Sequence, residues 1–190
     1  MLRDFFKQAM PRMLVGAATM EPAKGGRVTS SSSTAAPEMR ALDVLLGNWR
    51  CDSVVYPSGR GPDEVVLRGT LAPVLGGAWY QWNFTQDPND IVQPPMSGRY
   101  TFGWNPATAK YVAIYYDDRG NYLLQTTPTP EWVDGHLRFQ GTTTLVDEGE
   151  VQFTDDITSR GPGHFRNEVT ITSHGETRLH ATLECVQEEP

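Results

Sequence analysis

From residue 48 to the end of the chain, apolar and polar residues alternate with a period near two, which is typical of strands that bury one face. The pattern predicts strands near residues 48–56, 64–72, 78–86, 97–104, 110–117, 121–127, 136–145, 150–158, 164–173 and 176–186. Turn residues, such as Asp134-Gly135 and His174-Gly175, separate several of them. Closing such an up-and-down sheet removes its two exposed edges. We therefore predict a mainly β fold, a closed up-and-down antiparallel barrel of 8–10 strands.

The chain before residue 48 has a different pattern. Apolar residues at the i, i+3, i+4 spacing of an amphipathic helix occur at Leu2, Phe5, Phe6, Ala9, Met10, Met13 and Leu14. Pro37, Leu42, Leu45 and Gly47 predict a short helix that plugs or flanks the barrel. We divide the chain into an N-terminal amphipathic segment (1–21), a Pro/Gly/Ser-rich linker (22–36) and a β-barrel domain (37–190). The amphipathic segment is either a lid or interface, or a frayed tail.

The alternation also predicts which residues of the first and last strands share the inner face. If these strands pair, two rows of side chains point inward, Trp49, Cys51, Ser53 and Val55 on one strand and Leu179, Ala181, Leu183 and Cys185 on the other. We expect Cys51 and Cys185 to be neighbouring buried thiols or small core residues rather than a disulfide. Two cysteines are too few for a disulfide scaffold, which favours a reducing compartment.

Charge and hydropathy narrow the classes of partner. The net charge is −7, and residues 1–36 carry five Lys/Arg against two Asp/Glu, so the barrel domain is strongly acidic. An acidic body repels phosphate backbones, which argues against nucleic acid as a partner. No stretch has the length and apolarity of a membrane span or a signal peptide. We expect a cytoplasmic protein, a monomer or homodimer, without a membrane span.

Three groups of residues resemble motifs of one bacterial family. They are Pro37-Glu38, Leu42, Leu45-Leu46-Gly47 and Trp49, then Leu75-Gly76-Gly77-Ala78-Trp79, and last Gly103-Trp104-Asn105 followed by Lys110-Tyr111-Val112. Together they resemble the family called domain of unknown function 1579 over residues 37–186, and the Gly-x-Trp entry resembles the wider calycin group of lipocalins and fatty-acid-binding proteins. The resemblance implies a calycin-like barrel with an internal pocket. The resemblance assigns no catalytic residue to this sequence, because the family's activity is not generally known.

The barrel wall is unusually aromatic. The candidates for contact with a ligand are inward-facing rings of three consecutive strands, Tyr80, Trp82, Phe84, Tyr100, Phe102, Trp104, Tyr111 and Tyr115. These rings either line a cavity or fill a narrow barrel, as side chains of small barrels do. Tyr115 is the one catalytic candidate, because an inward phenol could donate a hydrogen bond to a substrate carbonyl.

Other polar clusters give weaker predictions. We predict that Asp147, Glu148 and Glu150, like Asp155 and Asp156, are solvated acidic loops rather than calcium sites. His180 and Glu184 belong to the outer face in the favoured register and become an acid/base pair only in the reversed one. The sequence contains no zinc motif, phosphate loop or dinucleotide fingerprint, so we expect no metal and no cofactor.

These predictions leave three hypotheses for function. In the first, the barrel binds a small apolar or aromatic ligand as a carrier, sequestering protein or sensor. In the second, it acts on an apolar or polyketide-like metabolite as a cofactor-independent cyclase or isomerase, which small bacterial barrels of similar build suggest by architecture alone. In the third, it binds haem through an inward histidine.

Overall fold

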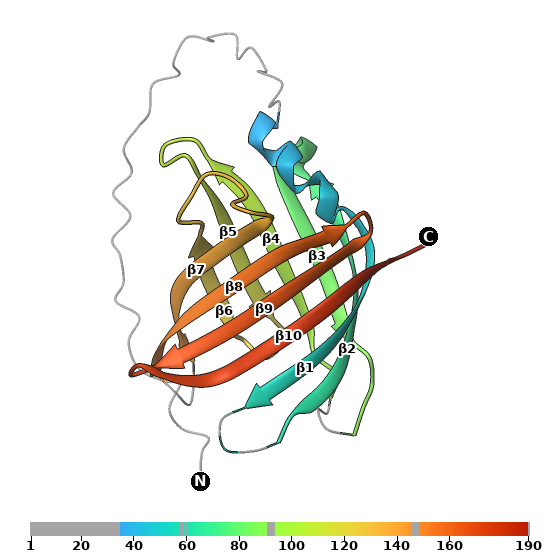
Figure 1. Ribbon diagram of the computed structural model, residues 1–190, viewed down its shortest axis with the longest axis vertical. Helices are drawn as coiled ribbons and strands as arrows, with labels where there is room; N and C mark the ends of the chain where they lie inside the picture. Colours follow the sequence, from blue (N-terminus) through green and yellow to red (C-terminus); the bar gives the residue numbers. More distant parts are fainter. Residues whose placement is uncertain (1–34, 58, 60, 91–93, 146–148, 190) are drawn as a thin grey trace, which may run out of the picture. The chain divides into compact units, whose positions relative to one another are not determined.

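The computed structural model describes residues 35–57, 59, 61–90, 94–145 and 149–189 (Figure 1). Within this part of the chain, ten antiparallel strands form a closed barrel in which each strand pairs with its sequence neighbours and the last pairs with the first. The strands are β1 (Gly47–Pro57), β2 (Asp63–Val74), β3 (Trp79–Gln86), β4 (Ser97–Asn105), β5 (Lys110–Asp117), β6 (Tyr122–Thr126), β7 (His136–Leu145), β8 (Gly149–Gly161), β9 (His164–Ser173) and β10 (Glu176–Glu188). The predicted mainly β, closed up-and-down barrel is confirmed.

The described residues also form two 3-10 helices. They are η1 (Pro37–Leu45), which precedes β1, and η2 (Leu75–Gly77), which lies between β2 and β3. The short helix predicted before the first strand is thus present as η1. The predicted N-terminal amphipathic helix lies outside the described residues, as does nearly all of the predicted linker, so both stay predictions. No helix among the described residues has the length and apolarity needed to cross a membrane.

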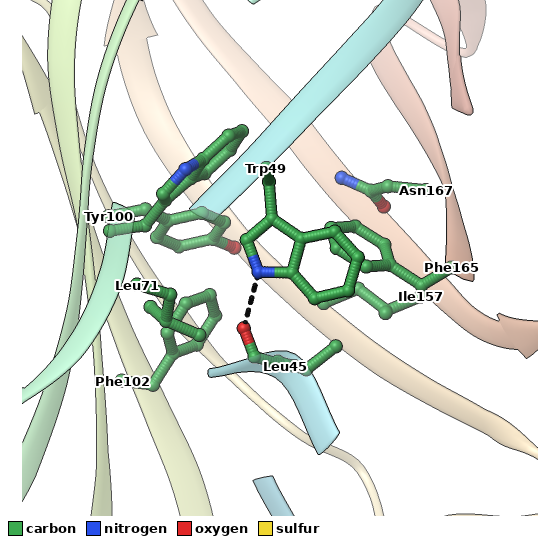
Figure 2. A pocket seen from close by; sticks show the side chains of 9 residues that line it. Leu45, Trp49, Leu71, Tyr100, Phe102, Ile157, Phe165 and Asn167 are labelled. Carbon is green, nitrogen blue, oxygen red and sulfur yellow. Dashed lines mark hydrogen bonds between the residues drawn. The ribbon is translucent and has the colours of Figure 1, made fainter. Parts of the chain in front are cut away.

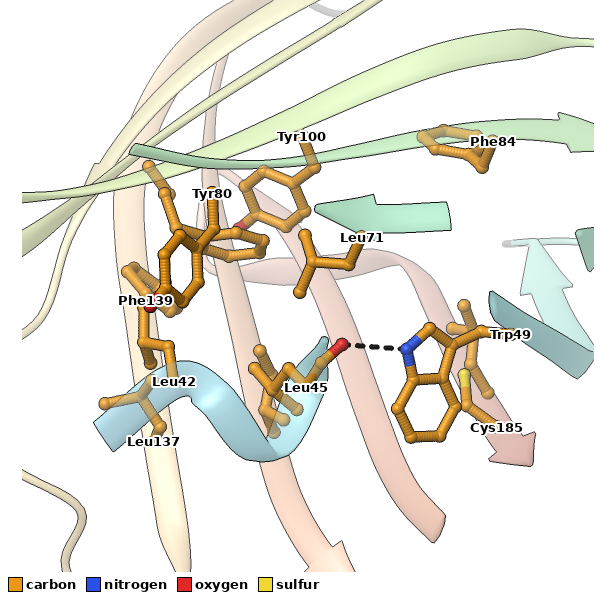
Figure 3. Packing of buried hydrophobic residues seen from close by; sticks show 14 of the residues in the cluster. Leu42, Leu45, Trp49, Leu71, Tyr80, Phe84, Tyr100, Leu137, Phe139 and Cys185 are labelled. Atoms are coloured by element: carbon orange, nitrogen blue, oxygen red, sulfur yellow. Dashed lines mark hydrogen bonds between the residues drawn. The ribbon is translucent and has the colours of Figure 1, made fainter. Parts of the chain in front are cut away.

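The helix η1 covers the barrel end at which β1 begins. Its Met39, Leu42 and Leu45 are buried. Figure 3 shows Leu42 and Leu45 pointing from η1 among the inward side chains of the strands. The Trp49 indole donates a buried hydrogen bond of 2.7 Å from Nε1 to the Leu45 carbonyl. Because Leu45 is the last residue of η1, this bond uses a helix carbonyl that would otherwise lack a partner.

The barrel closes where β1 meets β10, and the predicted inner faces of these strands are confirmed by their register. Cys51 lies directly opposite Cys185, and Ser53 opposite Leu183. The prediction of unbridged thiols is wrong, because Cys51 and Cys185 form a disulfide, with their Cα atoms 4.0 Å apart. Directly opposed side chains on one face of an antiparallel pair are close enough to bond. Disulfides persist mainly in oxidising compartments, so these cysteines no longer support a reducing cytoplasm.

Candidate ligand site inside the barrel

Four polar side chains from four strands meet in the barrel interior. Tyr100 comes from β4, Gln125 from β6, Asp155 from β8 and Asn167 from β9, and all four are buried. Asp155 Oδ2 accepts hydrogen bonds from the Tyr100 hydroxyl at 2.9 Å and from Gln125 Nε2 at 2.6 Å. Asp155 Oδ1 accepts a third from Asn167 Nδ2 at 3.0 Å. The Tyr100 hydroxyl also contacts Gln125 Oε1. We call these four residues the polar cluster.

The carboxyl of Asp155 lies at the centre of the polar cluster without a positive partner. Among the described residues, no arginine, lysine or histidine forms an ion pair with it. Burial raises the pKa of Asp155, and the hydrogen bonds from Asn167, Gln125 and Tyr100 only partly offset that effect. Since its pKa is higher in the folded than in the unfolded chain, ionising Asp155 as pH rises lowers the stability of the fold.

Asp156 is the next residue along β8 and has the opposite environment. Its side chain points outward, where it receives hydrogen bonds from Arg138 and His136. Partial burial alone would raise the pKa of Asp156. The hydrogen bonds and charges of Arg138 and His136 lower this pKa by more than burial raises it, so the net change is downward. A lowered pKa means that Asp156 stabilises the fold when ionised and that this contribution is lost as pH falls.

A small cavity of about 30 Å³ adjoins the polar cluster (Figure 2). Its lining is mostly apolar and consists of Leu45, Trp49, Leu71, Trp82, Tyr100, Phe102, Ile157, Phe165 and Asn167. A cavity of this size holds roughly one or two water molecules. Of the two alternatives for the aromatic rings, filling of the barrel therefore dominates around this small cavity.

Two buried polar atoms of the cavity lining have no hydrogen-bond partner, Asn167 Oδ1 and Trp82 Nε1. The Asn167 side chain is only 8% exposed. Figure 2 shows its carboxamide extending from β9 toward Trp49 in the interior. Buried polar atoms in folded proteins are nearly always hydrogen-bonded, so an unpartnered acceptor and donor on one cavity require an explanation.

The eight aromatic residues predicted to contact a ligand divide into three groups. Trp82, Tyr100 and Phe102 line the cavity. The second group lies near η1, where Tyr80 bonds Asp43, Tyr111 donates to the Glu38 carbonyl at 2.6 Å, and Trp104 packs edge-on against Tyr111. The third group is Phe84 and Tyr115, whose stacked rings have centroids 6.2 Å apart. Only the first group touches the cavity of this structure.

Tyr115, the predicted catalytic residue, faces the interior but its hydroxyl is engaged. It donates a hydrogen bond of 2.9 Å to Asp117 Oδ2 and lies 3.8 Å from Met96 Sδ. Burial, and then the charge of Asp117, raise the pKa of the Tyr115 phenol. The phenol is therefore neutral at ordinary pH, and its proton is directed at Asp117 rather than at the cavity.

The prediction that Asp155 and Asp156 form a solvated acidic loop is wrong, because both lie within β8, and the outward Asp156 side chain is only 16% exposed and paired with His136 and Arg138. Asp155 is 3% exposed. The signal was present in the alternation, because Val151, Phe153, Asp155 and Ile157 occupy every second position of β8. Strict use of that period places Asp155 inside with its apolar neighbours.

The four histidines of the chain all lie outside the barrel interior. His136 and His164 pair with Asp156 and Glu184, at 2.8 Å and 3.2 Å. His180 stacks on Tyr56, which is exposed, and His174 lies in a turn with a φ of 51°. The inward histidine required by the haem hypothesis is absent, and the reversed register of His180 and Glu184 is wrong. The described residues include no group of three or more His, Cys, Asp or Glu that could hold a metal ion.

Two solved structures share this barrel. The crystal structure of Rv2717c from M. tuberculosis is 13% identical with a TM-score of 0.61, and the match covers 82% of this chain and 99% of that one. The S-type phycobiliprotein lyase CPES from Guillardia theta is 13% identical with a TM-score of 0.56, and the match covers 80% of this chain and 92% of that one. At these identities the likeness establishes the fold alone.

Sequence comparison identifies the family. No curated protein matches the chain. The model of the family described as protein of unknown function (DUF1579) matches residues 34–184, which include every motif that suggested the resemblance. The chain therefore belongs to the DUF1579 family.

Proposed function

We propose that the barrel interior binds a small organic ligand with a flat apolar body and a polar end group. The observation that carries this proposal is the unpartnered Asn167 Oδ1, an acceptor on an otherwise apolar cavity that also has the unpartnered Trp82 Nε1. Apolar walls with a few polar groups are the usual composition of small-molecule sites. A bound end group that donates a hydrogen bond would give Asn167 Oδ1 the partner it lacks.

The size of the cavity limits what can enter without rearrangement. About 30 Å³ accommodates an end group, so the ligand's body must displace side chains of the lining. Trp82 and Phe165 are the only partly exposed side chains of that lining, and the others are buried. Moving these two rings disturbs the packed core least, so we propose that the ligand's body takes their place.

Native mass spectrometry of protein isolated from its host tests the proposal. The expected result is a protein that retains a small molecule, and Asn167→Leu should lose it. Asn83 is exposed and alternates with the inward residues of β3, so Asn83→Leu is the matched control and should retain the ligand. If the parent protein carries no adduct and a screen of small aromatic compounds detects no binding, the proposal is wrong.

A second candidate function is cofactor-free cyclisation or isomerisation of an apolar or polyketide-like metabolite in the same interior. It is favoured by Tyr100, which lines the cavity and whose hydroxyl is bonded to the buried Asp155 carboxyl, an arrangement that can move or polarise a proton away from water. That a lyase shares the fold makes such chemistry compatible with the barrel. Tyr115 remains a candidate donor in this proposal.

Turnover distinguishes the enzyme from the carrier, sequestering protein or sensor. Once a retained compound is known, its conversion by the parent protein should be lost in Tyr100→Phe while binding persists. Tyr115→Phe tests the other phenol in the same assay. A ligand that binds and is released unchanged by the parent protein would exclude the catalytic function for that compound.

A further inference from the structure

We infer that the interior site selects ligands whose polar end is a cation bearing N–H groups, such as a protonated amine or an amidinium, over neutral and anionic analogues of the same shape. The inference rests on the proposed function, because it names the chemical class of the ligand for the same cavity. It is argued from the polar cluster, from the missing positive charge and from the aromatic lining.

The hydrogen bonds around Asp155 match an ionised carboxylate. Its oxygens face the Gln125 and Asn167 amide nitrogens, which can only donate, and the Tyr100 hydroxyl, whose single proton lies between Asp155 Oδ2 and Gln125 Oε1. A carboxylate has about four acceptor positions, so one is still open after these three bonds. Asn167 Oδ1 is a second open acceptor of the polar cluster. The cluster therefore offers open acceptors, which suit N–H donors.

In the part of the chain that the structure describes, no positive side chain pairs with the polar cluster. The charge of Asp155 acts on the phenols of Tyr100 and Tyr115, whose pKa values are raised first by burial, so both phenols are neutral. A buried carboxylate without a counter-charge is unfavourable, and a cation that enters the interior relieves that cost. The same field repels an anion. Asn167 and Tyr100 line the cavity and bond Asp155, so the negative charge lies directly behind the cavity wall.

The aromatic lining adds a second preference for a cation. The rings of Tyr100 and Phe102 have centroids 4.5 Å apart, and those of Trp49 and Phe165 are 4.7 Å apart. All four rings border the cavity. The faces of aromatic rings attract cations, more strongly where water is excluded. A protonated nitrogen on a small apolar group fits a space of about 30 Å³ lined in this way.

The test uses three aromatic probes of similar size and different charge, benzylammonium, benzyl alcohol and benzoate at pH 7. Binding is followed by the indole N–H resonance of Trp82 in a 15N-labelled full chain, assigned with Trp82→Phe. We expect benzylammonium to bind at least about tenfold more tightly than benzyl alcohol, and benzoate not to bind. Asp155→Asn should bring the two affinities together, whereas Asp156→Asn, on the outer face, should leave the preference unchanged.

The outcomes separate the two proposals. Equal affinities for the charged and neutral probes in the parent protein would overturn this inference and leave the proposed function standing. A preference that survives in folded Asp155→Asn would also overturn it. If Asp155→Asn does not fold, the ranking of the three probes by the parent protein decides alone. Absence of binding by every probe, together with no retained host compound, would overturn the proposed function itself.

Discussion

The disulfide between β1 and β10 joins the first and last strands of the barrel, which are neighbours in space but far apart in the sequence. Cys51 and Cys185 are 134 residues apart in sequence, so the bond closes a loop that contains most of the barrel. The chain-entropy relation for a loop of that length gives about 17 cal/mol/K, or about 5 kcal/mol at 25 °C. We take this as an upper value and expect reduction to lower the free energy of unfolding by about 3–5 kcal/mol.

The loss should arise mainly in the unfolded chain, because the bond is not needed to pair the strands. β1 and β10 pair from Asn48↔Glu188 to Pro57↔Leu179, on both sides of the two cysteines. Both cysteine side chains are buried, so the reduced thiols stay in the core as small apolar groups. The folded barrel is therefore expected to keep its near-ultraviolet circular dichroism in reductant.

Urea unfolding followed by tryptophan fluorescence, with and without reductant, measures the effect. With a typical slope of about 2 kcal/mol/M, the midpoint should fall by roughly 2 M on reduction. The control is Cys51→Ala/Cys185→Ala, whose midpoint should be the same under both conditions. Equal midpoints for the oxidised and reduced parent protein would refute the entropic reasoning. Two titratable thiols in parent protein unfolded without reductant would refute the disulfide.

Two further predictions concern the polar cluster and the attachment of η1. Because folding raises the pKa of Asp155, Asp155→Asn should gain stability relative to the parent as pH rises above about 4. Because folding lowers the pKa of Asp156, Asp156→Asn should lose stability relative to the parent as pH rises toward about 4, and the difference should stay constant above that value. Urea midpoints across pH check the signs, and parallel curves for Asp155→Asn and the parent would contradict them. Trp49→Phe leaves a buried carbonyl unpaired and should cost about 1–3 kcal/mol in a thermal or urea melt. The matched Trp132→Phe, whose bond to η1 is exposed, should cost less than about 1 kcal/mol, and equal losses would contradict the role of burial.

The fold could be predicted because one physical signal repeats along most of the chain. Each strand buries one face, so a shift of register by one residue would move every apolar side chain to the solvent. That constraint sets Trp49 and Cys51 inside on β1 and Leu183 and Cys185 inside on β10, as the sequence predicts. The short β6 is the least regular part, with only Leu124, Gln125 and Thr126 paired to β7.

The site could be predicted only in part. It depends on distances between side chains of different strands, and the alternation of apolar and polar residues does not give these distances. The prediction that three consecutive strands turn aromatic side chains inward was correct. Which of these rings reach the cavity depends on the orientation of each side chain and on the position of η1. Tyr100 and Asn167 are 67 positions apart in the chain and become partners of Asp155 only when the barrel closes. The disulfide was missed for a different reason, because Cys51 and Cys185 were expected to be neighbours but the count of two cysteines favoured a reducing compartment.

A purely structural role does not explain the composition of the polar cluster. Polar networks in a core can give a fold specificity, but they do so when every donor and acceptor in them is paired, and otherwise an apolar core of the same volume is more stable. Here Asp155, Gln125 and Tyr100 bond one another within the cluster, yet Asp155 keeps one open acceptor position and Asn167 Oδ1 has no partner. The open atom belongs to a residue that lines the cavity, where a guest can supply a partner. That coincidence of an incomplete network with the open space is what distinguishes a binding site from a packed core in this barrel.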